Sequence, residues 1–319
     1  MAEVAARFNV SPPQISVWRS IFERVRDDQI TLPKKQRYKI GDLLKAIRLP
    51  KATYHDERKR IANPHDKYAK AKKMILQIAQ RFKVRGRWTA GYRRIQAELD
   101  KMELHLSGDT IRKLMSELNV QVSLYNRHRN GKYSSYHGTV GKIAANKLSQ
   151  KFNAHQPYQV IHTDVTQVRL ANHQWAYISV MIDEASQEIL AFQLSTSPNK
   201  ELIMRTLEEL IDNLPDGAQP TIHSDQGWHY QLAYYTQKLA DYHFVQSMSR
   251  KGNCLDNAPV ESFFHLYKTE LLAGFPPCKD ITELRKLSQN YIQYFNNVRT
   301  TLKTKGMTPV EYRNHALVA

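Results

Sequence analysis

Alternation of apolar and polar positions in the C-terminal half predicts an α/β sheet. Three consecutive runs have the alternation and the β-branched content of strands, and short turns separate them. Beyond them, apolar positions recur every three or four residues, as in helices, with two short strand-like runs in between. The order indicates three antiparallel strands that lead into parallel βαβ units covered by helices. The predicted strands are 160–170, 175–182, 188–194, 221–223 and 243–246, and the predicted helices are 200–213, 231–242, 256–272 and 282–298.

The first part of the chain has helical periodicity instead. Apolar residues recur at Ile95, Leu99 and Met102, and a second stripe begins after a turn around Ser107 and Gly108. This spacing is typical of two amphipathic helices that pack through one face. The second stripe comprises Ile111, Leu114, Met115 and Leu118. Weaker patterns of the same kind predict helices at 40–46 and 52–60.

The first 30 residues have the pattern of two short helices joined by a tight turn. Ser11 is a suitable N-cap for the second helix, and the prolines beside it suit a first turn. In a helix-turn-helix the second helix enters the major groove of DNA, and Gln14 and Arg19 would then face the DNA. A simple helical hairpin has the same pattern, so both interpretations stay open. Because the chain begins almost at the turn, we expect a partial helix-turn-helix and a truncated or alternatively started product.

Charge is unevenly divided along the chain, which has a formal net charge of +17. Residues 1–155 contain 33 Lys and Arg against 13 Asp and Glu, whereas residues 156–319 contain 14 against 17. A basic half joined to a nearly neutral half indicates a region that binds a polyanion, attached to a core with another task. The polar faces of the two amphipathic helices offer candidate phosphate contacts, although ordinary solvated charges would look the same. These candidates are Arg93, Arg94, Arg112 and Lys113.

Composition excludes several other classes of protein. The longest apolar stretches fall well short of the ~20 residues that span a bilayer, and the N-terminus lacks the features of a secretory signal. Two cysteines, Cys254 and Cys278, form no cluster with the spacing of a disulfide framework or a zinc site. We therefore expect a cytoplasmic protein with no membrane partner.

These patterns divide the chain into four parts. Between the helical region and the predicted sheet, the composition shifts to Arg, Lys, Asn, Gly, Ser and Tyr with little apolar periodicity, which favours a linker that becomes ordered only on DNA. The predicted domains are a partial helix-turn-helix at 1–30, a helical DNA-binding region at 31–125 with a helix-turn-helix at about 88–120, a basic linker at 126–157, and an α/β core with a C-terminal helical tail at 158–319.

Three acidic residues occur at unusual positions in the predicted core. Asp164 lies inside a strand, where intrinsic propensity disfavours Asp. Asp225 ends a short strand before a helix, where ligand sites form in α/β sheets. Glu261 lies on a helix that otherwise carries bulky apolar residues. Each has an ordinary explanation alone, as an edge-strand Asp, a capping Asp or a surface Glu.

Together, the three carboxylates suit magnesium-dependent chemistry on phosphodiesters. Such chemistry needs hard oxygen ligands that converge from separate elements onto two ions about 3.5 to 4 Å apart. One ion would activate the attacking oxygen and the other would stabilise the leaving 3′ oxygen. Asp164, placed centrally in the sheet, would most plausibly bridge both ions.

Several phrases of the sequence together resemble one family. His-Thr-Asp-Val-Thr around Asp164, His-Ser-Asp-Gln-Gly around Asp225 and SRKGNCLDNAPVESFF around Glu261 are similar to three motifs of the retroviral integrase superfamily, and specifically of bacterial transposases of the IS-three family. The 35 residues between Asp225 and Glu261 match the family's spacing. The tail YIQYFNNVRTTLKTKGMTPVEYR continues the likeness, and GYRRIQAEL resembles the family's helix-turn-helix before the core. Ile161-His162 departs from the Trp that often precedes this Thr-Asp.

The resemblance implies a fold, an activity and partners. The fold is an RNase H-like mixed α/β sheet flanked by helices and preceded by all-α helix-turn-helix modules. The implied activity is that of a DDE-type transposase, with Asp164, Asp225 and Glu261 as catalytic residues and ligands of two Mg²⁺ ions, with Mn²⁺ as a substitute. It would cleave and join strands of double-stranded DNA at insertion-sequence terminal repeats and at target DNA, as a homo-oligomer, a dimer or larger. The location would be the bacterial cytoplasm, associated with the nucleoid when bound to DNA.

Neighbouring residues suggest secondary roles. Asn257 and Lys268 share a helix face with Glu261 and are candidate DNA contacts. The resemblance implies that Lys268 contacts the transposon end, although a structural lysine would fit the position too. His162 and His223 each lie two residues before an active-site aspartate, so strand alternation allows both to face the site.

Three rival functions remain to be compared. A retroviral integrase should carry a His-His-Cys-Cys zinc module, which the sequence lacks, and an RNase H-type nuclease would lack the basic helical modules. A catalytically defective or truncated DNA-binding product could act as a repressor of transposition. Such a protein would keep the basic half, but the presence of all three carboxylates disfavours a dead enzyme.

Overall fold

The computed structural model describes residues 50–62, 66–122, 143–148, 154–250 and 254–318. It divides into two compact units, residues 1–67 and 68–319. The first unit contributes helix α4 (Lys51–Ala62), which agrees with the helix predicted at 52–60. The helix-turn-helix predicted at 1–30, with Gln14 and Arg19, and the helix at 40–46 lie outside the described residues. No helix among the described residues is long and apolar enough to cross a membrane.

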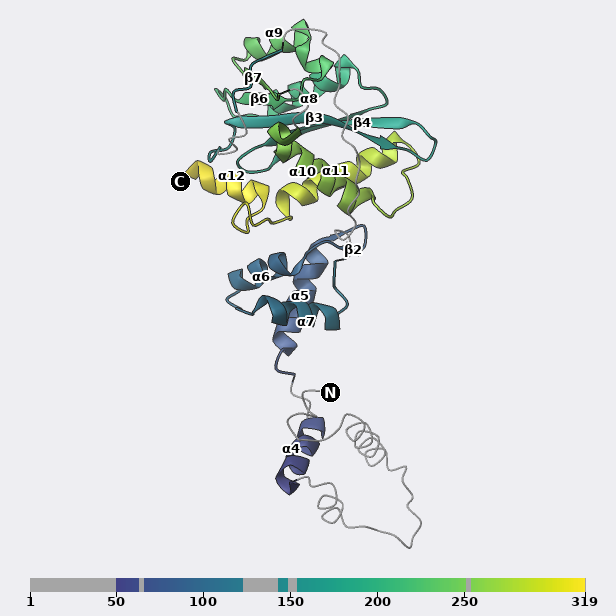
Figure 1. The fold of residues 1–319 in the computed structure, drawn as a ribbon, viewed down its shortest axis with the longest axis vertical. Helices are drawn as coiled ribbons and strands as arrows, with labels where there is room; N and C mark the ends of the chain where they lie inside the picture. The colour runs from purple at the N-terminus through teal and green to yellow at the C-terminus, as the bar shows by residue number, and fades with distance from the viewer. Residues whose placement is uncertain (1–49, 63–65, 123–142, 149–153, 251–253, 319) are drawn as a thin grey trace. The chain divides into compact units, whose positions relative to one another are not determined.

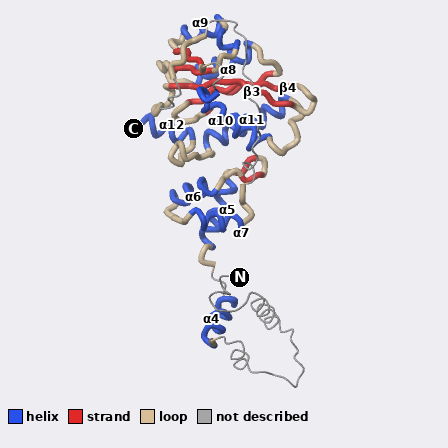
Figure 2. Tube along the Cα trace, in the orientation of Figure 1, coloured by secondary structure: helices blue, strands red, loops and turns tan. Residues whose placement is uncertain are grey.

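A five-stranded mixed sheet forms the centre of the second unit. Its strand order is β5-β4-β3-β6-β7, and Figure 2 shows these strands in red. Strands β3, β4 and β5 pair antiparallel, whereas β6 pairs parallel to β3 and β7 parallel to β6. This topology confirms the predicted α/β fold class. The strands are β3 (Val160–Arg169), β4 (Trp175–Asp183), β5 (Ile189–Ser195), β6 (Thr221–Ser224) and β7 (Val245–Met248).

Helices cover both faces of the sheet (Figure 1). On one face, Ile203 and Leu207 of α8 (Lys200–Asn213) pack with Met181 of β4. On the other face, Val260 of α10 packs with Val180 of the same strand. Neighbouring residues of a strand therefore pack against opposite helix layers, as the alternation predicted. The remaining core helices are α9 (Ala233–Asp241), α10 (Ala258–Leu266), α11 (Ile281–Asn297), α12 (Pro309–Val318) and the short turns η1 (Trp228–Gln231), η2 (Cys254–Asn257) and η3 (Tyr267–Leu272).

The helix predicted at 256–272 is not one continuous α-helix. It consists of the 3₁₀ turn η2, the α-helix α10 and the π-helical turn η3. A buried ion pair stands at the π-helical end, where Arg299 Nη2 lies 3.0 Å from Glu270 Oε1, and both side chains are almost fully buried. The Tyr291 hydroxyl also donates to Glu270. These fixed partners of Glu270 accompany the change of helical pitch.

A helical region with its own small core precedes the sheet in the second unit. Its core includes Ile75, Ile95, Leu99 and Ile111, all fully buried. The Ser107 hydroxyl caps the last of these helices by accepting from the Thr110 amide, as its position after the turn suggests. The elements are α5 (Ala69–Arg81), β1 (Lys83–Val84), β2 (Arg87–Trp88), α6 (Tyr92–Lys101) and α7 (Gly108–Glu117). Helices α6 and α7 were predicted, whereas α5 and the β1–β2 hairpin were not.

The β1–β2 hairpin joins this helical region to the core. The guanidinium carbons of Arg85 and Arg87 lie 4.0 and 3.8 Å from the centre of the Phe275 ring. Arg87 also donates to the carbonyls of Ala273 and Gly274. Gly274 has a φ of +75°, and a Cβ there would lie 2.5 Å from the Arg87 guanidinium. The close approach of the arginine therefore depends on glycine at this position.

Part of the predicted linker packs on the core. The Lys147 amide donates to Ser247 Oγ at 3.0 Å, and Asn146 Nδ2 donates to Asp256 Oδ2 at 2.9 Å. Residues 143–148 are thus placed by the protein itself, which differs from the expectation of order only on DNA.

Candidate active site

Asp164 lies in the middle of the central strand β3. Its Oδ1 accepts a hydrogen bond from the Val165 amide at 2.7 Å. Burial raises the pKa of Asp164 well above its ordinary value, and the charges of Asp225 and Glu261 raise it further. The Val165 hydrogen bond and the charge of Lys268 act in the opposite direction. The local field at Asp164 therefore favours a positive charge.

Asp225 directly follows β6, the strand that pairs parallel with β3. Its Oδ1 accepts from the Gly227 amide at 2.8 Å, which fixes the carboxylate at the start of a turn. A Cβ at Gly227 would lie 2.9 Å from the same oxygen, so this hydrogen bond requires glycine. Burial raises the pKa of Asp225, whereas the Gly227 hydrogen bond and His229 lower it.

Glu261 comes from the first turn of α10, which packs on β3. Its side chain is half-buried. Burial raises the pKa of Glu261, and the charge of Asp225 raises it further. Three carboxylates that disfavour each other's ionisation thus come from a strand, a strand end and a helix. Oxygen ligands of this kind suit a hard divalent cation.

The pocket at this site has a volume of about 250 Å³. Asp164 and Asp225 line it together with Thr166, Trp228 and His229. Within the described ranges, no group of three His, Cys, Asp or Glu side chains has the arrangement of a preformed metal site. The three carboxylates fit a divalent cation by their chemistry, but they would have to draw closer together to hold it.

Trp228 and His229 are pocket residues that the sequence analysis missed. Their rings are nearly stacked, with centroids 3.9 Å apart, and His229 Nε2 lies 3.0 Å from the Pro198 carbonyl. Burial lowers the pKa of His229, against the effect of Asp225. Their place directly after Asp225, at the end of a strand, was the signal that could have identified them.

Lys268 lies on the same side as the carboxylates. Its Nζ donates to Thr166 Oγ1 of β3, and the residue is exposed. Partial burial of the ammonium group lowers the pKa of Lys268, and the charge of Asp164 opposes this shift. The amine thus lies at the margin of the site, and its contact with DNA stays a prediction.

Asn257 does not lie on the surface of the protein. It is 3% exposed, and its amide groups bond to His162 and to the Thr163 carbonyl. This burial argues against the predicted contact between Asn257 and DNA. His162 and His223 are fully buried as well and do not belong to the pocket lining. Burial, followed by the charge of His162, lowers the pKa of His223 to about 4.

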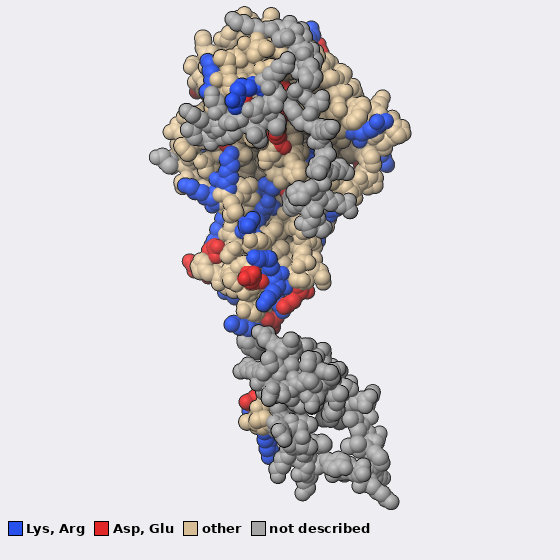
Figure 3. Space-filling view, in the orientation of Figure 1, with Lys and Arg blue, Asp and Glu red and all other residues tan. Residues whose placement is uncertain are grey.

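The basic residues predicted on the helical region fall into two groups. Arg93, Arg112 and Lys113 are exposed, and Figure 3 shows basic side chains over this part of the chain. Arg112 pairs with Asp109 at 3.0 Å. Arg94 instead donates to the carbonyls of Thr300 and Thr89, so its guanidinium links the helical region to the core.

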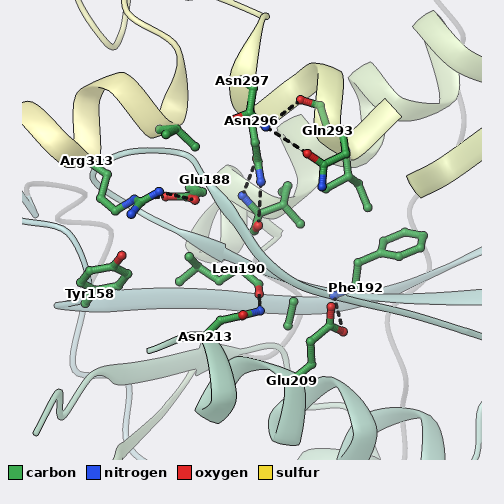
Figure 4. A pocket seen from close by; sticks show the side chains of 14 residues that line it. Tyr158, Glu188, Leu190, Phe192, Glu209, Asn213, Gln293, Asn296, Asn297 and Arg313 are labelled. Atoms are coloured by element: carbon green, nitrogen blue, oxygen red, sulfur yellow. Dashed lines mark hydrogen bonds and ion pairs between the residues drawn. The ribbon is translucent and has the colours of Figure 1, made fainter. Parts of the chain in front are cut away.

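A larger pocket, about 450 Å³, lies along the edge strand β5 and contains none of the three carboxylates. Its polar side chains form hydrogen bonds and an ion pair within the protein (Figure 4). Asn296 bonds both the amide and the carbonyl of Ile189, Glu209 accepts from the Phe192 amide, and Asn213 donates to the Leu190 carbonyl. These contacts take the place of a neighbouring strand. The pocket therefore stabilises the edge of the sheet and is not a candidate active site.

Comparison with known families identifies three segments of the chain. A family model described as "Integrase core domain" matches residues 154–254, and a second model with the same description matches residues 261–317. A model described as "HTH-like domain" matches residues 67–129. Together these segments contain all three carboxylates and the described helical region.

Two relatives extend this likeness over most of the chain. Transposase InsK for insertion sequence element IS150 of Escherichia coli (strain K12) is 36% identical over 88% of this chain and 95% of its own length. Transposase InsF for insertion sequence IS3A of the same organism is 31% identical over 55% of this chain and 60% of its own length.

Among solved structures, the integrase catalytic core domain of HTLV-2 in complex with magnesium covers 50% of this chain and 97% of its own, at 14% identity and a TM-score of 0.37. That likeness is too distant to add to the argument. The sequence relatives and the integrase core are sufficient: the chain belongs to the IS-three family of insertion-sequence transposases.

Proposed function

We propose that this protein is a DDE-type DNA transposase that cleaves and joins DNA strands at the ends of an insertion sequence. The observation that carries the proposal is electrostatic. Burial raises the pKa of Asp164, Asp225 and Glu261, and neighbouring carboxylates raise it further for Asp164 and Glu261. Asp164 and Asp225 also line one pocket. An electrostatic arrangement of this kind costs stability unless a cation binds. Structural carboxylates are more often paired with Arg or Lys within the fold.

The three carboxylates would hold two Mg²⁺ ions, with Mn²⁺ as a substitute. When bound, such a pair activates the attacking oxygen and stabilises the leaving 3′ oxygen. The chain's own residues prepare the site for this. The amide hydrogen bonds of Val165 and Gly227 fix one oxygen each of Asp164 and Asp225. The other oxygen of each carboxylate stays available to a ligand.

The reaction would have two steps in one active site. In the first, the oxygen of a water molecule forms a bond to phosphorus, the bond to the 3′ oxygen breaks, and that oxygen takes up a proton as a free 3′-OH. In the second, the oxygen of this 3′-OH forms a bond to the phosphorus of another phosphodiester and loses its proton, while the bond to that phosphodiester's 3′ oxygen breaks and this oxygen takes up a proton. Lys268, exposed beside Asp164, is suited to hold a phosphate of the DNA end.

The DNA partners would be the terminal repeats of the element and a target duplex. Exposed basic residues of the helical region, including Arg93, Arg112 and Lys113, would contact phosphates. Because two ends must be brought together, we propose a dimer or larger homo-oligomer on DNA, acting in the bacterial cytoplasm.

The test is a strand-cleavage and strand-transfer assay on DNA from the ends of the element, with Mg²⁺ or Mn²⁺. We expect wild-type protein to nick and join DNA, and Asp225→Asn to lose both activities while still binding the ends. Asp216→Asn is a matched control, since Asp216 is an exposed loop residue, and it should keep full activity. Tight end binding without cleavage by the wild type would instead support a DNA-binding repressor of transposition.

A further inference from the structure

A buried polar cluster lies next to the catalytic carboxylates and joins four segments of the core. At its centre is His162 of β3, which is fully buried. Its Nδ1 lies 2.9 Å from Asn257 Oδ1, and its Nε2 lies 2.8 Å from Glu184 Oε2. Asn257 precedes α10 and Glu184 follows β4, so the ring connects elements that are far apart in the sequence.

The hydrogen bonds of this cluster have a defined direction. Asn257 Nδ2 donates to the Thr163 carbonyl at 3.0 Å, which leaves Oδ1 to accept from the His162 ring. Burial alone would raise the pKa of Glu184, but hydrogen bonds from His162 and the Ala154 amide outweigh it and leave the pKa below its ordinary value. Glu184 is therefore held as a carboxylate, and the His162 ring lies between it and Asn257.

The cluster is adjacent to two of the three carboxylates. Asn257 is the N-cap residue of α10, and Glu261 lies four residues later, one helical turn along the same face. His162 lies two residues before Asp164, on the same face of β3. The bond between His162 and Asn257 thus ties the helix that carries Glu261 to the strand that carries Asp164. The two contacts of Asn257 are both made to β3.

The start of α10 is also held from its other side. Asp256, which is 1% exposed, accepts from the Arg250 backbone amide at 2.8 Å and from Asn146 Nδ2 at 2.9 Å. The turn before α10 therefore has little freedom to rotate. Since the carboxylates repel one another, a fixed support is needed to keep Glu261 facing Asp164 before a cation arrives.

We propose that His162 and Asn257 are positioning residues that set the distance between Glu261 and Asp164, and thereby the affinity of the site for divalent cations. This inference rests on the proposed function. Neither residue touches the cation or the DNA; each acts through the elements that carry the ligands. Supporting residues of this kind typically change metal affinity by roughly 10–100-fold when removed.

The test measures Mn²⁺ binding to DNA-free protein by isothermal titration calorimetry, with melting temperature in EDTA as a second readout. Asn257→Ala removes both contacts to β3, and we expect its Kd for Mn²⁺ to rise by roughly tenfold or more. His162→Gln keeps a donor but cannot reach both acceptors, and its Kd should rise less. If the alanine variant does not fold, Asn257→Ser, which keeps a small N-cap side chain but is too short for both contacts to β3, replaces it in the same comparison.

Thr206→Ala is the matched control. Thr206 is fully buried and its hydroxyl donates to the Leu202 carbonyl at 2.7 Å, but it belongs to α8, on the opposite face of the sheet from α10. We expect it to lower the melting temperature as Asn257→Ala does, with a Kd within twofold of the wild type. Equal Kd values for Asn257→Ala and Thr206→Ala would overturn the inference, because both residues would then serve stability alone.

A further variant separates this inference from the proposed function. Asp225→Asn should abolish Mn²⁺ binding if the three carboxylates form the metal site. Should Asp225→Asn bind Mn²⁺ like the wild type, the proposed function is wrong and the positioning role with it. Loss of binding in Asp225→Asn, together with wild-type affinity in Asn257→Ala, would overturn the positioning role only.

Discussion

His223 is a buried histidine that must stay neutral in the folded protein. Burial lowers its pKa to about 4, from an ordinary value of 6.5. Its Nδ1 is bonded to Ser247, while Nε2 has no hydrogen-bond partner among the described atoms. Unfolding releases the ring to water, where it takes up a proton at any pH below about 6.5.

The sign of the resulting pH dependence follows from this difference. Between pH 6.5 and about 4 the unfolded chain binds more protons at this ring than the folded protein, so stability falls as the pH falls. We expect His223 to cost roughly 2 kcal/mol of unfolding free energy between pH 7 and pH 5. Urea unfolding in EDTA at both values measures the loss, which His223→Gln should reduce. The exposed His265→Gln is the control, and an equal pH effect in both variants would contradict the prediction.

At the same scale, sequence reasoning singled out the three carboxylates but not the contacts that support them. Asp164 and Asp225 were recognisable because an Asp inside a strand and an Asp at a strand end are exceptions to local preference. The bonds of Asn257 could not be predicted in this way. They depend on which residue of β3 faces the start of α10, and a shift of one residue in that packing would present a different side chain.

At the scale of elements, the hairpin β1–β2 is one connection between the helical region and the core. Arg87 stacks on Phe275 and donates to two carbonyls of the same loop. A cation held over an aromatic ring contributes about 0.5–1 kcal/mol at exposed sites, and more when water is excluded.

A double-mutant cycle tests whether this contact couples the two parts. We expect Arg87→Ala and Phe275→Ala each to destabilise the protein, and the double variant to be less destabilised than the sum by about 1 kcal/mol. Urea unfolding provides the free energies. Strict additivity would show that the stacking contributes nothing, and Lys83→Ala with Phe275→Ala is the control pair because Lys83 stacks on Trp88 instead.

Element prediction succeeded where periodicity was strong. Helix α8 has the predicted bounds because it buries one side, and β3 to β5 agree within about one residue because helix layers cover both faces of the sheet. Strand β7 begins two residues later than predicted, because His243 has a φ of 57° and continues the turn after α9. The hairpin escaped prediction because two-residue strands are too short to show alternation.

At the scale of the whole molecule, basic residues are concentrated before the catalytic core. Residues 1–155 carry 33 Lys and Arg against 13 Asp and Glu. This asymmetry predicts that affinity for DNA falls steeply with salt, because each phosphate contact releases condensed counterions.

The salt dependence separates DNA contacts from internal ones. Arg112→Ala and Lys113→Ala should each lower the slope of log K against log salt by about 0.9 if the side chain contacts a phosphate. Arg94→Ala should leave the slope unchanged and lower the melting temperature, because its guanidinium bonds the Thr300 and Thr89 carbonyls. Fluorescence anisotropy with labelled end DNA at several salt concentrations gives the slopes. A reduced slope for Arg94→Ala alone would reverse the assignment.

The hydrogen bonds along the edge strand β5 affect how copies of the protein can contact one another. Asn296, Glu209 and Asn213 occupy backbone groups of β5 that would otherwise attract the edge of another sheet. A second copy of the protein therefore finds no free strand edge at these groups, and pairing through β5 into a growing β-ribbon is blocked. Contacts between copies on this side must be made by side chains.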